Sequence, residues 1–200
     1  MFKPARSVLV EEEIELARRC AGGSRDAQRA LFQQQRLRVH RTLFRIMGSN
    51  RHMEDLVQDT FIEVLASVGS FAGRSSLATW VDTVAARVAY RHLSRRGAFA
   101  RQAQEVDDLP APSNDPEQQR NAHEALRRLY AALERIEPKS RIAYTLHVVD
   151  GRPIHEVARI TRTSVVAVKS RIWRARRLMH ERARRDPVLS EFLPSKRETT

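Results

Sequence analysis

The sequence has a single cysteine, Cys20, among its 200 residues. One cysteine cannot form a disulfide within the chain or supply a cysteine-based zinc cluster. Long apolar runs are missing as well: the N-terminus lacks the hydrophobic stretch of a signal peptide, and no segment approaches the roughly 18 apolar residues of a membrane span. We therefore expect a cytoplasmic protein with no membrane span.

Glycine and acidic residues are also in short supply. With only seven glycines and few β-branched runs, the chain is expected to be all-α. The 24 Asp and Glu are outnumbered by 36 Lys and Arg, which gives a net charge of +12 and a pI of about 11.1. Such a balance predicts a polyanionic partner, either nucleic acid or an acidic membrane surface.

The first part of the chain, residues 10–97, has helical periodicity interrupted by turn sequences. Ser24 is a candidate N-cap after the first helix, and MGSN at 47–50 ends the second. Two further helices are expected from His52 or Met53 to about Val68 and from about Leu77 to Arg96. Their apolar stripes, at spacings of three and four, are Val57, Phe61, Val64 and Val68 in one and Trp80, Val84 and Val88 in the other.

Residues 98–120 differ in character from what precedes them. The stretch from Gly97 to Arg120 has three prolines, no sustained apolar period, and five acidic residues against two arginines. Too few apolar groups are present to offset the entropy of ordering this segment. We expect a flexible acidic linker between two small helical domains.

Helical periodicity returns in residues 121–185, and residues 186–200 are expected to be a tail. The pattern predicts helices at 121–136, 139–149, 154–160 and 163–179. A short helix, a polar turn and a basic helix in this order are typical of a helix-turn-helix.

The last of these helices carries two contrasting faces. One face is an apolar stripe of Val165, Val168, Ile172, Ala175 and Met179. The other comprises Val166, Lys169, Ser170, Trp173, Arg174 and Arg177. Its three cations lack nearby carboxylates, since no Asp or Glu occurs between Glu156 and Glu181. In a helix-turn-helix this face would enter the DNA major groove, where the cations can contact phosphates or guanine edges.

Several stretches resemble one family. VVAVKSRIWRARRLM resembles the region 4 recognition helix of sigma factors, and LERIEPKSRIAYTLHVVDGRPIHEVARIT resembles the sequence before it. EDLVQDTFIEVLASVGSFAGRSSLATWVDTVAARVAYRHLSRR resembles sigma region 2. The matches come in the right order and cover roughly residues 13–183. The chain therefore resembles an extracytoplasmic-function (ECF) sigma factor, the small type that holds only regions 2 and 4.

The resemblance implies a transcription initiation subunit, without enzymatic activity, catalytic residue, cofactor or metal. It would bind core RNA polymerase, through the β′ clamp coiled coil and the β flap, and promoter DNA, and an anti-sigma factor would control it. Region 2 would span 10–97 and region 4 would span 121–185. The linker is either a plain tether or a segment that enters the polymerase active-site channel, with Asp107, Asp108, Asp115 and Glu117 mimicking the charge of RNA.

The resemblance also assigns residues to each partner. Core polymerase would contact Asp55, Gln58, Asp59 and Ile62. The −10 element would contact Phe71, Gly73, Arg74, Ser75, Ser76, Arg87, Arg91 and Arg95. The −35 element would contact Lys169, Ser170, Trp173, Arg174 and Arg177.

Several positions depart from the family pattern. In region 2, Gln34 and Gln35 replace aromatic residues that are often found there. Thr161 stands where the turn usually has a glycine, and a β-branched residue tolerates positive φ poorly. Val166 replaces another common glycine at the start of the basic helix. The alternative hypothesis is a helix-turn-helix regulator that binds operator DNA without core polymerase. That hypothesis accounts for residues 121–185 but gives no role to the EDLVQ and FAGRSS sequences.

Overall fold

The computed structural model describes residues 5–99 and 116–192, and these residues form helices and turns with no strand among them. The first half contains α1 (Ala5–Ala21), α2 (Arg25–Met47), α3 (Met53–Ser67), the 3-10 turn η1 (Val68–Ser70) and α4 (Leu77–Phe99). The second contains α5 (Pro116–Leu133), α6 (Pro138–Tyr144), the π-helical turn η2 (Thr145–Val149), α7 (Ile154–Ile160), α8 (Val165–Ala183) and α9 (Pro187–Phe192). The predicted all-α class is confirmed for this part of the chain.

The ends of α2 follow the predicted signals. The Ser24 hydroxyl accepts a hydrogen bond from the Ala27 N–H at 3.4 Å, as an N-cap does. At the other end, Gly48 adopts a left-handed conformation with φ 73° and donates its N–H to the Phe44 carbonyl. A Cβ at Gly48 would lie 2.1 Å from the Tyr130 ring, so both the backbone and the packing require glycine here.

The second half differs from the sequence-based expectation at both ends. α5 begins at Pro116 and not near residue 121, because proline fits the first turn of a helix, where its missing N–H costs nothing. The expected tail starts with α9, whose N-terminus is capped by the Asp186 carboxylate through the N–H groups of Val188 and Leu189. Residues 100–115, which hold most of the predicted acidic linker, lie outside the described residues.

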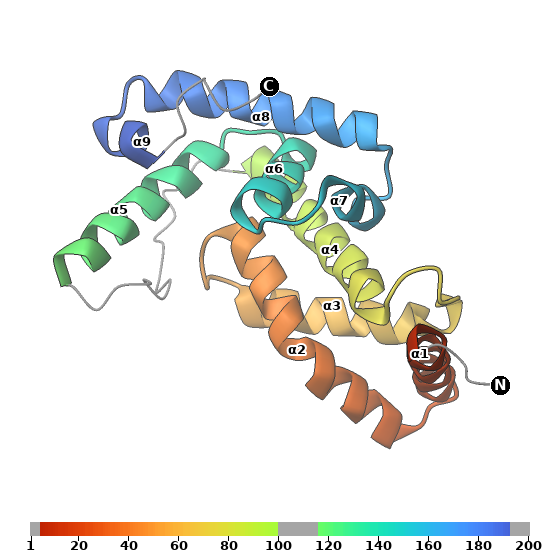
Figure 1. Ribbon diagram of the computed structural model, residues 1–200. Coiled ribbons are helices and arrows are strands. Elements are labelled where there is room, and N and C mark those ends of the chain that lie inside the picture. The colour runs from red at the N-terminus through yellow and green to blue at the C-terminus, as the bar shows by residue number, and fades with distance from the viewer. Residues whose placement is uncertain (1–4, 100–115, 193–200) are drawn as a thin grey trace.

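The two halves pack directly against each other. In Figure 1 the helices of the first half occupy the lower part of the view, and α6 and α7 lie against α4 beneath α8. Buried residues of α2, α3 and α4 form a continuous apolar cluster with Ile142, Leu146, Val157 and Ile160 of the second half. A smaller cluster, with Tyr130, Leu133 and Met179, joins α5, α8 and α9. The position of α4 between the halves therefore matters for every surface described below.

The predicted apolar stripes of α3 and α4 point inward with two exceptions. Phe61, Val64, Val68, Val84 and Val88 are buried. Val57 is half-buried, and so is Trp80, whose ring meets Phe71 edge-on with centroids 6.0 Å apart. Trp80 thus packs at the rim of the core and supports the loop before α4.

Candidate nucleic-acid interface

The basic helix α8 starts from a tight turn at residues 161–164. Ser164 caps the helix by accepting the Ala167 N–H at 3.1 Å. The positive φ in this turn falls on Arg162, at 48°, whereas Thr161 has an ordinary φ of −86°. Thr161 also donates its hydroxyl to the Val157 carbonyl at 2.7 Å. The predicted strain at Thr161 is therefore absent, because the next residue makes the left-handed turn.

The inner face of α8 is the stripe predicted from the sequence, apart from its first residue. Val168, Ile172, Ala175 and Met179 are buried. Val165 was expected to join them, but it is 37% exposed at the first position of the helix. The four buried side chains fix the rotation of α8 and therefore determine which residues face outward.

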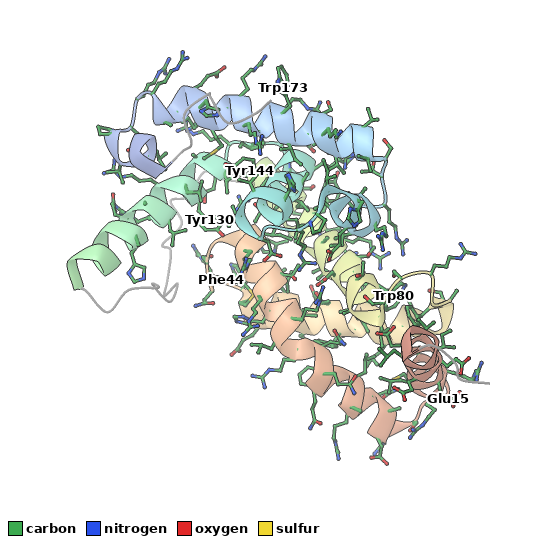
Figure 2. All side chains as sticks on the ribbon, in the orientation of Figure 1. Glu15, Phe44, Trp80, Tyr130, Tyr144 and Trp173 are labelled. Atoms are coloured by element: carbon green, nitrogen blue, oxygen red, sulfur yellow. The ribbon has the colours of Figure 1, made fainter. Side chains whose placement is uncertain are left out.

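The outer face of α8 presents the predicted group to solvent. All six side chains are exposed: Val166, Lys169, Ser170, Trp173, Arg174 and Arg177. Figure 2 shows Trp173 on the side of α8 that points away from the rest of the molecule. Trp173 is 61% exposed, whereas a tryptophan that belongs to a core is mostly buried.

The cations on this face differ in whether a carboxylate lies near them. Within the described part of the chain, Lys169 and Arg174 have no carboxylate partner. Arg177 was predicted to be uncompensated, but it lies 3.8 Å from Glu181 one turn along α8. Its guanidinium also stacks over Trp173, 5.4 Å from the ring centroid. The Arg177–Glu181 pair is solvent-exposed, so it only weakly neutralises the face.

A second set of cations lies on α4, and two of its three members are paired with a carboxylate. Arg87 donates to Glu63 of α3 at 3.2 Å, and Arg91 forms an ion pair with the same carboxylate. Arg95 is exposed at the end of the described side chains. Glu63 could not be predicted from the spacing of the cations along α4, because it belongs to the neighbouring helix α3.

The loop before α4 is more enclosed than its sequence indicates. Phe71 is 7% exposed and belongs to the core. Gly73 has a φ of 67°, and a Cβ there would lie 2.8 Å from Ile14 of α1, so protein covers the side that glycine leaves open. Ser76 accepts the Thr79 N–H at 3.2 Å and so caps α4. Arg74 is the cation of this loop, and its side chain is exposed. We therefore interpret Phe71 and Gly73 as residues that hold the loop in place.

The outward face of α3 borders a groove of about 970 Å³ beside α2. All four residues assigned to core polymerase, Asp55, Gln58, Asp59 and Ile62, are exposed, and all but Asp59 line this groove. Phe32 of α2 lines it as well, and its ring is tilted by 59° against the ring of Phe61, with centroids 4.7 Å apart. Phe32 and Leu37 are 40% and 59% exposed, and neither was predicted, although both are apolar residues on a polar stretch of α2. Of the two, Phe32 lines this groove.

Other kinds of site find no support in the described residues. No three His, Cys, Asp or Glu side chains there are arranged to hold a metal ion. No described helix is long and apolar enough to cross a membrane. Cys20 is buried, and burial raises the pKa of its thiol, which keeps it protonated near neutral pH.

The architecture therefore defines a helical protein with a basic helix held outward after a short helix and a tight turn. Comparison with known proteins identifies the family. Residues 31–99 match Sigma-70 region 2, and residues 126–179 match Sigma-70, region 4. The chain is 30% identical over 132 residues to the ECF RNA polymerase sigma-E factor of Escherichia coli, covering 61% of this chain and 69% of that protein.

Other relatives agree. ECF RNA polymerase sigma factor SigX of Bacillus subtilis is 28% identical over 80% of this chain and 87% of its own length. ECF RNA polymerase sigma factor SigE of Mycolicibacterium smegmatis is 30% identical over 76% of this chain, which spans 59% of that protein.

Two solved structures share the fold. CnrH, in complex with the cytosolic domain of CnrY, has a TM-score of 0.60 and 22% identity over 87% of this chain and 98% of that one. RpoE of Bartonella quintana, in complex with the anti-sigma factor NepR, has a TM-score of 0.53 and 24% identity over 74% and 91%. The chain belongs to the ECF sigma factors, the alternative sigma subunits of RNA polymerase, which are not enzymes.

Proposed function

We propose that this chain binds core RNA polymerase, directs it to promoters that carry specific −10 and −35 elements, and acts in the cytoplasm. The observation that carries the proposal is the outer face of α8. A tryptophan, a serine and cations with little or no carboxylate compensation face solvent there, while the opposite stripe of the same helix is buried. A solvated helix would intersperse carboxylates among such cations.

The −35 element is assigned to this α8 face. Lys169 and Arg174 reach phosphates or the O6 and N7 atoms of guanine, and Ser170 contacts either. Trp173 packs on sugars or on a thymine methyl, with Arg177 held against its ring. The exposed Val166, 76% accessible, adds an apolar contact near the start of the helix and so biases base preference there.

The −10 element is assigned to the loop after η1 and to α4. Arg74, Ser75 and Ser76 lie at the loop surface, while Arg87, Arg91 and Arg95 follow along the helix. Extruding a base from a duplex costs a few kcal/mol, which contacts in such a loop offset. Phe71 and Gly73 contribute by fixing the loop on α1 and Trp80.

Core polymerase is assigned to the groove beside α3. Ile62 and Phe32 supply exposed apolar surface, and Asp55, Gln58 and Asp59 surround it with polar groups. An apolar centre with a polar rim suits a protein interface. By resemblance, the partner is the coiled coil of the β′ clamp, and region 4 contacts the β flap. The structures of CnrH with CnrY and of RpoE with the anti-sigma factor NepR support the proposal that this chain also has an anti-sigma partner.

Run-off transcription with sigma-free core polymerase on a pool of random promoters tests the proposal. We expect transcripts that depend on this protein and start downstream of one shared pair of elements. The alternative is an operator-binding regulator. It would be favoured if the free protein bound duplex sites tightly and gave core polymerase no new start sites.

A further inference from the structure

Cations also line a cleft between α4 and the second half of the molecule. The cleft has a volume of about 330 Å³, near the lower end of the roughly 300–1,000 Å³ that is usual for small-molecule sites. Four cations line it, Arg87, Lys139, Arg162 and Arg171, and no carboxylate is among the described residues of its walls. Glu63 compensates Arg87 from outside the cleft.

The other three cations are not compensated. Lys139, Arg162 and Arg171 form no ion pair with any carboxylate of the described residues. Glu137 is close to Lys139 in sequence, but its carboxylate caps α6 by accepting the N–H groups of Lys139 and Ser140, each at 3.0 Å. The cleft therefore carries positive charge that this part of the chain leaves for an anionic ligand.

The inner part of the cleft is apolar. Ala86, Ile142 and Ile160 line it and are at most 5% exposed. The half-buried ring of Tyr90 adds an aromatic surface, and the Lys139 Nζ atom lies over this ring at 5.6 Å from the centroid. Apolar walls with a few charged or polar groups at defined positions are typical of sites for small organic molecules.

Two threonine hydroxyls in the cleft are fixed as hydrogen-bond acceptors. Thr83 donates its hydroxyl to the Thr79 carbonyl at 3.0 Å, and Thr161 donates to the Val157 carbonyl at 2.7 Å. Because a hydroxyl has one hydrogen, both oxygens present only lone pairs to a ligand. Lone pairs suit the amino groups of a nucleobase or the hydroxyls of a sugar, whereas they repel phosphate oxygens.

The two walls of the cleft are held together by contacts outside it. Asp82, next to Thr83 on α4, is fully buried and forms an ion pair at 2.6 Å with Arg152 of the second half. Thr42 of α2 donates to the other carboxylate oxygen at 3.0 Å. A ligand would therefore enter a cleft that is already formed, which lowers the cost of ordering the site on binding.

We propose that this cleft binds a nucleoside diphosphate, with its phosphates on Lys139, Arg162 and Arg171 and its nucleoside on the apolar inner surface beside Tyr90. Ammonium and guanidinium groups form charge-assisted hydrogen bonds with phosphate oxygens, and arginine can form two at once. A ligand that contacts both walls also stabilises the folded chain. The site is independent of the proposed sigma function, because its geometry belongs to the free protein.

Isothermal titration calorimetry of the full chain with ADP and with GDP, in the absence of divalent cations, tests the site. For at least one of the two we expect a Kd of about 10–100 µM. Inorganic pyrophosphate should bind about 10-fold more weakly or worse, because it cannot bury apolar surface in the cleft. Pyrophosphate binding as tight as that of both nucleotides would show simple charge attraction and would overturn the nucleotide site.

Two variants separate the phosphate contacts from the nucleoside contacts. Arg171→Gln should weaken nucleotide binding about 10-fold or more, as expected for a lost charge-assisted hydrogen bond. Tyr90→Leu should weaken nucleotide binding and leave pyrophosphate binding unchanged. Arg184→Gln is the control, because Arg184 is exposed at the other end of α8 and does not line the cleft. If Arg171→Gln does not fold, Lys139→Gln replaces it, since the Lys139 side chain is exposed.

The other use of these cations would be contact with promoter phosphates. If Arg171→Gln and Lys139→Gln lower affinity for duplex DNA while wild type binds neither nucleotide, the nucleotide site is wrong. Nucleotide binding by a protein that gives core polymerase no new start sites would retain the site and contradict the sigma assignment. Core-dependent transcription by a protein that binds neither nucleotide would do the reverse.

Discussion

Two helices, α4 and α8, carry all but one of the cations assigned to promoter DNA, and the two helices differ in how many of these cations have a carboxylate partner. On α4, Arg87 and Arg91 share the carboxylate of Glu63, and part of the helix faces the second half of the molecule. On α8, Lys169 and Arg174 point to solvent with no carboxylate partner among the described residues. The availability of a cation is therefore decided by the neighbouring helix, since both helices are basic along their own length.

The largest effect is expected from neutralising matched pairs on the two helices. Lys169→Gln with Arg174→Gln should weaken binding of the free protein to duplex DNA by roughly 100-fold at low salt, and the salt dependence should fall by about two phosphate contacts. Arg87→Gln with Arg91→Gln should change the same affinity by less than about 3-fold, because Glu63 already compensates them. Fluorescence anisotropy across a salt series measures both. Equal losses from the two pairs would show that α4 is as accessible as α8.

Alkaline pH offers a way to weaken the contact between the two halves of the molecule, where the Tyr130 hydroxyl donates to the Arg45 carbonyl at the end of α2. Burial raises the pKa of Tyr130 from 10.0 to about 12, although Arg141 and Arg45 oppose the rise. A folded-state pKa above the unfolded value means that the stabilisation is complete below pH 10 and is lost as the pH rises through 12. Two pKa units correspond to at most about 2.7 kcal/mol of unfolding free energy.

Chemical denaturation at pH 9.5 and pH 12 measures this loss. Tyr130→Phe is the control, because it cannot ionise. We expect wild type to lose up to about 2.7 kcal/mol more than the variant over this range. Equal losses would mean that the Tyr130 hydroxyl is more exposed to solvent than its burial indicates.

Most of the fold could be predicted from local signals in the sequence. The N-cap at Ser24, the glycine end of α2 and the stripe of α8 from Val168 to Met179 all depend on contacts within a turn or two of chain, or on burial of one face. α9 was not predicted, because an Asp–Pro pair is usually taken to interrupt a helix. Here Asp186 caps α9 and Pro187 fits its first turn.

The candidate site could be predicted on α8 but only in part on α4. A helical wheel places Trp173 and Lys169 on the outward face, because the apolar stripe of the same helix determines which face is buried. No spacing rule connects Glu63 with Arg87, or Asp82 with Arg152, since the members of each pair come from different helices. The resemblance supplied the role of the loop before α4, but tertiary packing placed Phe71 in the core.

The two neighbours Ile62 and Glu63 on α3 provide a test of whether protein and DNA surfaces are separate. Ile62 is 57% exposed at the groove, whereas Glu63 faces the arginines of α4. Ile62→Ser should lower affinity for core polymerase about 10-fold, as expected when the apolar surface that the partner would bury is removed. It should leave the affinity and salt dependence of free-protein DNA binding unchanged. A loss of DNA affinity, or unchanged core binding, would contradict the assignment of the groove.

The smallest effect, and the finest test of the comparison, comes from removing one carboxylate from each cationic helix. Glu63→Gln releases Arg87 and Arg91 together and should raise DNA affinity of the free protein about 3-fold. Glu181→Gln releases only Arg177, from a pair 3.8 Å apart with both side chains more than half exposed. We expect less than about a 1.5-fold change there, since exposed pairs compensate charge weakly. Equal gains in the same anisotropy assay would mean that Glu63 does not hold its arginines away from DNA, and α4 and α8 would then be equivalent surfaces.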